Sequence, residues 1–214
     1  MLAPTKLRYL DLVVDSERTP ESVQQDIVKA FQVASGLLER AFRAVANLVK
    51  AAWGAEVFSS EETSAENEIS VVQWASLCGA QILLTGDAGR AALTEAADYA
   101  PVAGLVLPGI YRFQVPHHGS RRNVSTEILD RWVGPRLPSR PATGSETWTA
   151  IISSAKEDTD HPRKSVVRAL IHRGASVIAT EGQNIYVFSQ FAPPRAGDRY
   201  SRWRTQRSRK NELS

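Results

Sequence analysis

Segments typical of β-strands alternate with segments typical of α-helices throughout residues 70–188, and this alternation limits the chain to layered folds. Strands are predicted where short apolar runs end at turn residues, and helices where apolar side chains recur every three or four positions. The predicted strands cover residues 70–74, 81–85, 111–115, 149–153, 176–180 and 185–188, and the predicted helices cover residues 88–99, 125–133 and 161–173. The pattern predicts an α/β (α+β layered) fold, with a sheet flanked by helices.

The preceding part of the chain follows a helical pattern. Thr19 and Pro20 are a typical helix start, because Thr caps the first amide groups and Pro fits the first helical position. From Val23 to Val49 apolar residues recur at helical spacing, so we expect a long amphipathic helix that packs on the sheet or on a second copy of itself. Residues 59–68 are polar and acidic, and we predict a surface loop there.

Charge is distributed unevenly along the 214 residues, although the net charge is only +3. Residues 195–214 hold seven Lys/Arg and two Asp/Glu, which gives +5 there and −2 in the rest of the chain. We therefore divide the chain into a helical segment with its acidic loop over residues 1–66, a layered unit over residues 67–192 and a basic tail over residues 193–214. The tail is predicted to be disordered, and its alternative role is to bind nucleic acid through phosphate contacts.

The composition excludes several classes of protein. One cysteine cannot form an internal disulfide, and there is no cysteine cluster for zinc or an iron–sulfur centre. No apolar run approaches the roughly 20 residues of a membrane-spanning helix, and the N-terminus lacks the cleavage site of a secretory signal. We therefore expect a soluble, cytoplasmic protein without a membrane partner.

Four side chains suited to metal binding follow predicted strands, and the carboxyl ends of strands are where open α/β sheets bind ligands. They are Asp87 after one strand, His117 and His118 after the next, and His161 after the third. Two other interpretations stay open at this point. Asp87 could be the N-cap of the following helix, and the histidines could be exposed residues of polar turns.

The two adjacent histidines are predicted to lie on an extended segment, where neighbouring side chains point apart. We therefore expect one of them to bind a metal, and the other to orient it or to contact substrate. His172, late in a predicted helix, is interpreted as a cation near the helix C-terminus. A serine-hydrolase pair with Ser120 is not favoured, because the Gly-x-Ser-x-Gly nucleophile motif is missing.

The order of these motifs is more specific than any one of them. The chain reads Asn67-x-x-Ser70, then Thr-Gly-Asp87, then Pro-His-His-Gly-Ser120, then His161-Pro. This order resembles the C-terminal half of the metallo-β-lactamase-fold hydrolases, and most of all the branch that includes the metallo-hydrolase domain of ComEC-type DNA-uptake proteins. The resemblance covers about residues 67–189.

The resemblance implies a fold and a set of metal ligands. The fold is the C-terminal half of an αββα sandwich, here preceded by a long helical segment. In the family the Asp of the Thr-Gly-Asp motif bridges two divalent metals, zinc or manganese, and this position is Asp87. His117 or His118 is then expected to complete the shell of one metal. His161 is expected near the substrate pocket and, with Asp87, in the catalytic set.

The resemblance also implies an activity. It is hydrolysis of a phosphoester or another ester by a water molecule that the metal pair activates. Besides His161, the residues expected to contact substrate are Asn67 and Ser120.

The family's first half has no counterpart in this sequence. No histidine precedes His117, so the His-x-His-x-Asp-His motif that supplies most metal ligands is absent. We therefore expect a partial metallo-hydrolase whose partner is the missing N-terminal half or a second copy of the chain. The competing interpretation is a non-catalytic binding or assembly module that kept the fold without a complete metal site, with residues 195–214 as a contact for nucleic acid.

Overall fold

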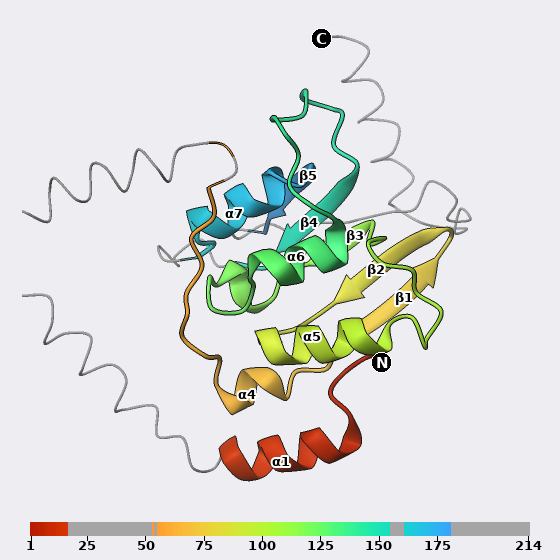
Figure 1. The fold of residues 1–214 in the computed structure, drawn as a ribbon, viewed down its shortest axis with the longest axis vertical. Helices are drawn as coiled ribbons and strands as arrows, with labels where there is room; N and C mark the ends of the chain where they lie inside the picture. The colour runs from red at the N-terminus through yellow and green to blue at the C-terminus, as the bar shows by residue number, and fades with distance from the viewer. Residues whose placement is uncertain (17–52, 54, 155–160, 181–214) are drawn as a thin grey trace, which may run out of the picture.

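The computed structural model describes residues 1–16, 53, 55–154 and 161–180, and Figure 1 shows their fold. Five strands form one mixed sheet in the order β1-β2-β3-β4-β5. The strands are β1 (Gln73–Leu77), β2 (Ala80–Leu84), β3 (Arg112–Gln114), β4 (Trp148–Ile152) and β5 (Ala175–Ala179). β1 pairs antiparallel with β2, and the other neighbouring pairs are parallel. The α/β class predicted from the alternation is confirmed.

The hairpin of β1 and β2 turns at Cys78 and Gly79, whose φ angles are 50° and 78°. Two consecutive residues with positive φ form the turn that matches the twist of paired strands. Leu77 therefore pairs with Ala80. The strand predicted over residues 70–74 is shifted toward this turn, because the turn sets the register of the pairing.

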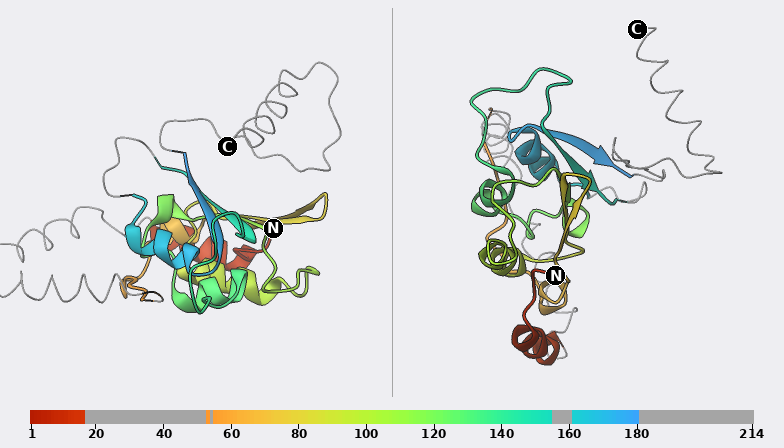
Figure 2. Two further views of the ribbon diagram at one scale, coloured as in Figure 1. Left: turned by 90° about the horizontal axis from the view of Figure 1, so that it is seen from above. Right: turned by 90° about the vertical axis from the view of Figure 1, so that its right-hand side faces the viewer.

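Three helices connect the parallel strands: α5 (Arg90–Tyr99), α6 (Thr126–Val133) and α7 (Lys164–Ile171). Right-handed crossovers between consecutive neighbouring strands place all connecting helices on the same face of a sheet. Figure 2 shows α5, α6 and α7 on one side. The core lies between these helices and the sheet, where Leu83, Phe113 and Ala150 are in register and fully buried.

The opposite face of the sheet carries the side chains that alternate with this core row. Ile82, Leu84, Ile151 and Ile178 lie on that face, because successive side chains of a strand point to opposite sides. Leu84 is 43% exposed, and the three isoleucines are partly exposed. Helices therefore pack on one face, and the other face presents aliphatic side chains.

The first residues of the chain join the sheet. The backbone of Ala3 pairs with that of Val72 just before β1, and Ala3 is 1% exposed. The helix α1 (Lys6–Ser16) follows. Its Arg8 guanidinium lies 3.2 Å from a carboxylate oxygen of Glu95 on α5, so an ion pair ties α1 to the helical layer.

The acidic stretch over residues 59–68, predicted as a surface loop, is partly buried. Its end forms the short helix α4 (Ala65–Glu68), in which Glu68 is 7% exposed. The Glu68 carboxylate accepts the backbone N–H of Ala92 at 2.6 Å, near the start of α5. The N-cap of α5 is Gly89, which has no side chain for capping, so Glu68 supplies the missing acceptor.

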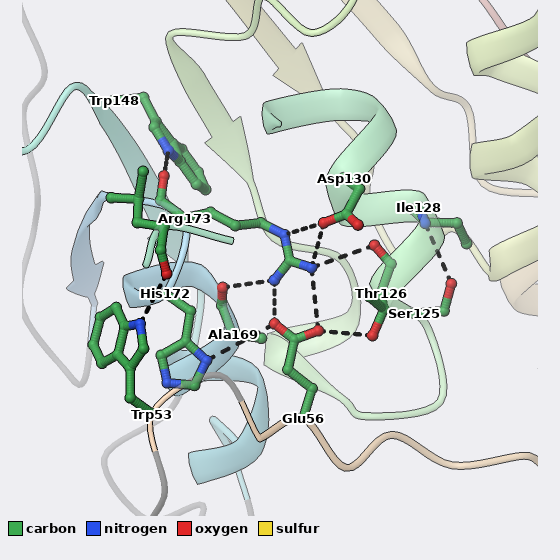
Figure 3. A network of polar contacts seen from close by, with 11 residues as sticks. Trp53, Glu56, Ser125, Thr126, Ile128, Asp130, Trp148, Ala169, His172 and Arg173 are labelled. Carbon is green, nitrogen blue, oxygen red and sulfur yellow. Dashed lines mark hydrogen bonds and ion pairs between the residues drawn. The ribbon is translucent and has the colours of Figure 1, made fainter. Parts of the chain in front are cut away.

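A buried ion network joins the chain upstream of this stretch to α6 and α7 (Figure 3). The side chains of Arg173 and Glu56 are 0% and 1% exposed and form an ion pair. Arg173 also lies 2.6 Å from Asp130 Oδ1 and donates to the carbonyl of Ala169 at 2.9 Å. The hydroxyl of Thr126 donates to Glu56 at 2.7 Å. Both buried charges are therefore compensated, which such a site requires.

His172 lies beside this network and is buried, whereas its sequence position predicted a cation. Its ring centroid is 4.5 Å from that of Trp53, and its Nδ1 lies 3.9 Å from Glu56 Oε1 (Figure 3). Burial lowers the pKa of His172, and the Glu56 carboxylate offsets this only in part. Three arginines lower the pKa further: Arg173, Arg168 and Arg136. The imidazole is therefore neutral at neutral pH, because its charged form would lose hydration.

We expect the free energy of unfolding to decrease as the pH falls below about 6.5, the pKa of an unperturbed histidine. Because the pKa of His172 is lowered in the folded state, the unfolded chain binds more protons in that range, and acid favours unfolding. Urea unfolding between about pH 5 and pH 8 measures this dependence. His172→Asn should show a weaker pH dependence than the parent, and an unchanged dependence would contradict the buried neutral state.

Three sequence predictions lie outside the described residues. They are the amphipathic stripe over residues 23–49, the strand over residues 185–188 and the basic tail over residues 193–214. Within the parts of the chain that are described, none of the helices has both the length and the hydrophobicity needed to cross a membrane.

Candidate functional site

The candidate site lies at the edge of the sheet where the parallel strands β2, β3 and β4 end. Asp87 follows β2, His117 and His118 follow β3, and His161 lies between β4 and α7. Because parallel strands end at one edge, the segments that follow them are neighbours. β1 is antiparallel to β2, so the chain entering β1 lies at this edge as well and brings Asn67 of α4 to the site.

His117, His118 and His161 form the group that we call the histidine cluster. Their ring centroids are 5.7 Å apart for His117 and His118, 6.3 Å for His117 and His161, and 6.5 Å for His118 and His161. His118 is exposed, and the other two are partly buried. The structure thus brings together three imidazoles that follow two separate strands in the sequence.

The turn that carries two of these histidines has an uncommon backbone. His117 and His118 begin the short 3-10 helix η1 (His117–Gly119), and their φ angles are 45° and 54°. The sequence predicted an extended segment whose two rings point apart, and this prediction is wrong. Positive φ angles curl the backbone, so both rings lie in one cluster. Non-glycine residues in this region of φ/ψ space are costly and concentrate at functional sites.

Gly119 allows the His161 segment to pack against this turn. The φ angle of Gly119 is 78°, and a Cβ there would lie 3.0 Å from Pro162 Cβ and 3.4 Å from Ile152 Cγ2. The N–H of Arg163 donates to the carbonyl of Gly119 at 3.2 Å. The close approach and the hydrogen bond together hold His161, the residue before Pro162, beside the turn.

Hydrogen bonds orient two of the three rings. His118 Nδ1 lies 2.6 Å from the carbonyl oxygen of Ser153, which can only accept, so Nδ1 carries the proton. His117 Nδ1 lies 3.2 Å from Asn67 Oδ1, and with this amide oxygen as acceptor Nδ1 again carries the proton. In the neutral form of either ring, Nε2 then holds the lone pair. Acceptors of this kind at the other ring nitrogen are typical of metal-binding histidines.

The charge state of His117 also suits a ligand. Burial lowers the pKa of His117, while the Asp87 carboxylate raises it. His118, His161 and Arg122 lower it further. His117 is therefore neutral at neutral pH, and only a neutral imidazole has a lone pair for a cation.

Asp87 belongs with the histidine cluster rather than with the helix that follows it. Its side chain is exposed, and its backbone N–H donates to Ser70 Oγ at 3.2 Å. The alternative role as the cap of α5 is wrong, because the N-cap is Gly89 and the capping carboxylate is that of Glu68. The charge of Asp87 acts on His117 instead.

Asn67 and Ser120, which were expected to contact substrate, both have partners within the protein. Asn67 orients the His117 ring. Ser120 is 8% exposed, and its Oγ accepts the backbone N–H of Arg122 at 3.3 Å. Its own N–H donates to the carbonyl of His117 at 2.9 Å, so Ser120 shapes the turn. A substrate contact by either residue stays a prediction.

Sequence reasoning gave no role to Ser70, Asn123 or the carbonyl of Ser153. Ser70 stands in the Asn-x-x-Ser motif, and Asn123 follows the Pro-His-His-Gly-Ser turn by three residues, so both carried a usable signal. The Ser153 carbonyl carried none, because every residue has a backbone carbonyl and only the fold decides which one meets a histidine.

The donors at this edge are three imidazoles and one carboxylate, which are ligand types that zinc and manganese accept. Among the described residues, no group of three or more His, Cys, Asp and Glu side chains is arranged to hold a metal ion.

Comparison with known proteins identified no relative of this chain. No family model matches the chain, and no curated protein and no solved structure matches it either.

Proposed function

We propose that the chain is a partial metal-dependent hydrolase of the metallo-β-lactamase type, whose histidine cluster and Asp87 hold one divalent cation. The observation that carries this proposal is the pair of Nδ1 hydrogen bonds. The carbonyl of Ser153 and the amide of Asn67 each engage Nδ1 of one ring, so that in the neutral rings of His118 and His117 the lone pair lies on Nε2. If the histidines were only exposed residues of a polar turn, water would satisfy their ring nitrogens and no fixed orientation of two rings would be expected.

The donors present are too few for two cations, and their types suit one. A catalytic zinc takes three protein ligands, and a pair of ions shares only part of its shell. The cluster and Asp87 offer four donor side chains, and these would have to move closer together around an ion, because no three of the described His, Cys, Asp and Glu side chains are arranged to hold one. A bound zinc or manganese ion would supply an activated water for attack on a phosphoester or another ester.

The chain's own residues prepare this site in three ways. Asn67 and the Ser153 carbonyl fix the orientations of the His117 and His118 rings. The rings therefore lose less rotational entropy when they bind a cation. The negative charge of Asp87 raises the pKa of His117, and it would attract a cation in the same way. Burial keeps the His117 ring neutral and ready to bind.

Hydrolysis in this proposal needs ligands and a second sheet from a partner, either a separate chain or a second copy. The sheet face opposite α5, α6 and α7 supports this part, because in the part of the chain that the structure describes Leu84 is 43% exposed there among partly exposed aliphatic neighbours. The same face supports a second candidate function, a binding or assembly module that uses the sheet face and carries out no reaction.

Calorimetric titration with Zn²⁺ and with Mn²⁺ tests the proposed site. We expect one ion per chain for the parent, and a loss of affinity of at least about tenfold for His118→Ala, since even outer-shell changes at metal sites cost 10–100-fold. His172→Asn is the control, because His172 is the chain's remaining histidine and lies beside the buried ion network. Binding that is equal in the parent and His118→Ala would contradict the proposal.

A further inference from the structure

The amide of Asn123 links the two loops that carry the candidate ligands. Asn123 is 1% exposed, and its Nδ2 donates to the carbonyl of Asp87 at 2.9 Å and to that of Ala88 at 3.3 Å. Both carbonyls lie between β2 and α5, whereas Asn123 lies between the histidine turn and α6. The side chain therefore spans the gap between the Asp87 loop and the histidine loop.

The backbone around Asp87 is held from three directions. Its N–H donates to Ser70 Oγ at 3.2 Å, and its carbonyl accepts from Asn123. The carbonyl of the preceding residue, Gly86, accepts the N–H of His117 at 3.1 Å. With both of its backbone polar groups engaged, Asp87 has a fixed main chain while its carboxylate stays exposed.

Asn123 is itself fixed relative to the histidines. Its N–H lies 3.4 Å from the carbonyl of Ser120, whose own N–H donates to the carbonyl of His117. Val124, the next residue, is fully buried, and Ser125 caps α6 through the N–H of Ile128. A shift of the histidine turn would therefore carry Asn123 with it and move the carbonyls of the Asp87 loop.

The chemistry of the site favours an amide at this position. Two carbonyl oxygens need two hydrogens from one small group, and the NH₂ of Asn provides them. An aspartate would set a carboxylate against both carbonyls, and a serine offers a single hydrogen. Burial raises the cost of leaving either carbonyl unpaired.

We propose that Asn123 is a positioning residue that sets the place of Asp87 relative to the histidine cluster. This inference rests on the proposed function for its link to metal binding. Its structural part is independent of metal, because the hydrogen bonds described above need no ion.

Two measurements on the whole chain test the proposal. In Asn123→Ala, hydrogen exchange of the amides of His117 and Asp87 should be at least about tenfold faster than in the parent, because their acceptors Gly86 O and Ser70 Oγ lie on or against the released loop. The affinity for Zn²⁺ should fall by about 10–100-fold, as it does when outer-shell partners of metal ligands are removed.

Ser125→Ala is the matched control. It removes the cap of α6 two residues away and leaves the Asp87 loop untouched, so it should lower the melting temperature and keep the Zn²⁺ affinity. Asn123→Ser retains one hydrogen, should give an intermediate loss, and provides the same test where the alanine variant does not fold.

The outcomes separate this proposal from the proposed function. Unchanged exchange and unchanged affinity in the Asn123 variants would overturn the positioning role. Faster hydrogen exchange in those variants supports the positioning role, whether or not the parent binds Zn²⁺. A parent chain that binds no Zn²⁺ would overturn the proposed function and leave the positioning role intact.

Discussion

We expect Glu56→Gln to lower the free energy of unfolding by about 3–5 kcal/mol, the cost of removing one partner from a buried ion pair. The Glu56 carboxylate is 1% exposed and faces an Arg173 side chain that is fully buried. The neutral amide leaves Arg173 with Asp130, whose side chain is 37% exposed, as its carboxylate partner in the network. Urea unfolding of the parent and the variant measures the difference.

Glu61→Gln is the matched control for this prediction. Glu61 also pairs with an arginine, Arg122, but the side chains of the two are 59% and 45% exposed. An exposed pair contributes about 0–1 kcal/mol. If the Glu56 and Glu61 variants lose the same stability, burial of the network is not what makes it stabilising.

The same network bears on the division of the chain at residue 66. The sequence assigned Glu56 to the N-terminal segment, whereas its partners Arg173 and Thr126 lie in the layered unit. A chain that began at residue 67 would keep the buried Arg173 and lose Glu56. Residues 55–66 therefore contribute to the stability of the sheet and its helices.

Glu68→Ala should lower the free energy of unfolding by about 2 kcal/mol, at the upper end for loss of a helix cap. The carboxylate is the acceptor for the N–H of Ala92 and also lies 3.6 Å from the Arg8 guanidinium. Because Asn67 directly precedes Glu68 in α4 and its Oδ1 faces His117, the same variant should weaken Zn²⁺ binding. Urea unfolding and calorimetric titration measure the two effects.

Glu66→Ala provides the comparison, since Glu66 lies on the same short helix and is exposed. Surface substitutions of this kind change stability by about 0.5 kcal/mol or less. Equal losses in the Glu66 and Glu68 variants would mean that general negative charge, and not the specific acceptor at the start of α5, stabilises this region.

Local sequence signals were sufficient for the class of fold and for the sheet edge at which the candidate residues meet. The alternation of apolar patterns predicted four of the five described strands and all three crossover helices near their observed bounds, and Ser125 marked the start of α6. The location of the site followed from the same pattern. Parallel strands end at one edge, so polar residues after successive strands had to become neighbours.

Local signals failed where a residue's role depends on a distant partner. The sequence cannot show that Glu56 meets Arg173, or that Glu68 replaces the missing cap at Gly89, because an acidic residue in a polar stretch is ordinarily solvated. It also gave an extended backbone to His117 and His118, since apolar and polar patterns report strand or helix and carry no information on positive φ angles.

The sequence by itself determined an α/β chain with Asp87 and three histidines at the carboxyl edge of a sheet, because periodicity and turn residues act over a few neighbouring positions. The tertiary structure alone decided which atoms of that site are engaged. The Ser153 carbonyl and Asn67 decide which nitrogen of His118 and of His117 is engaged, and the Asn123 side chain hydrogen-bonds from the histidine loop to the Asp87 loop. These partners lie 35, 50 and 36 residues from the groups they hold, and only packing of the folded chain brings them within hydrogen-bond distance.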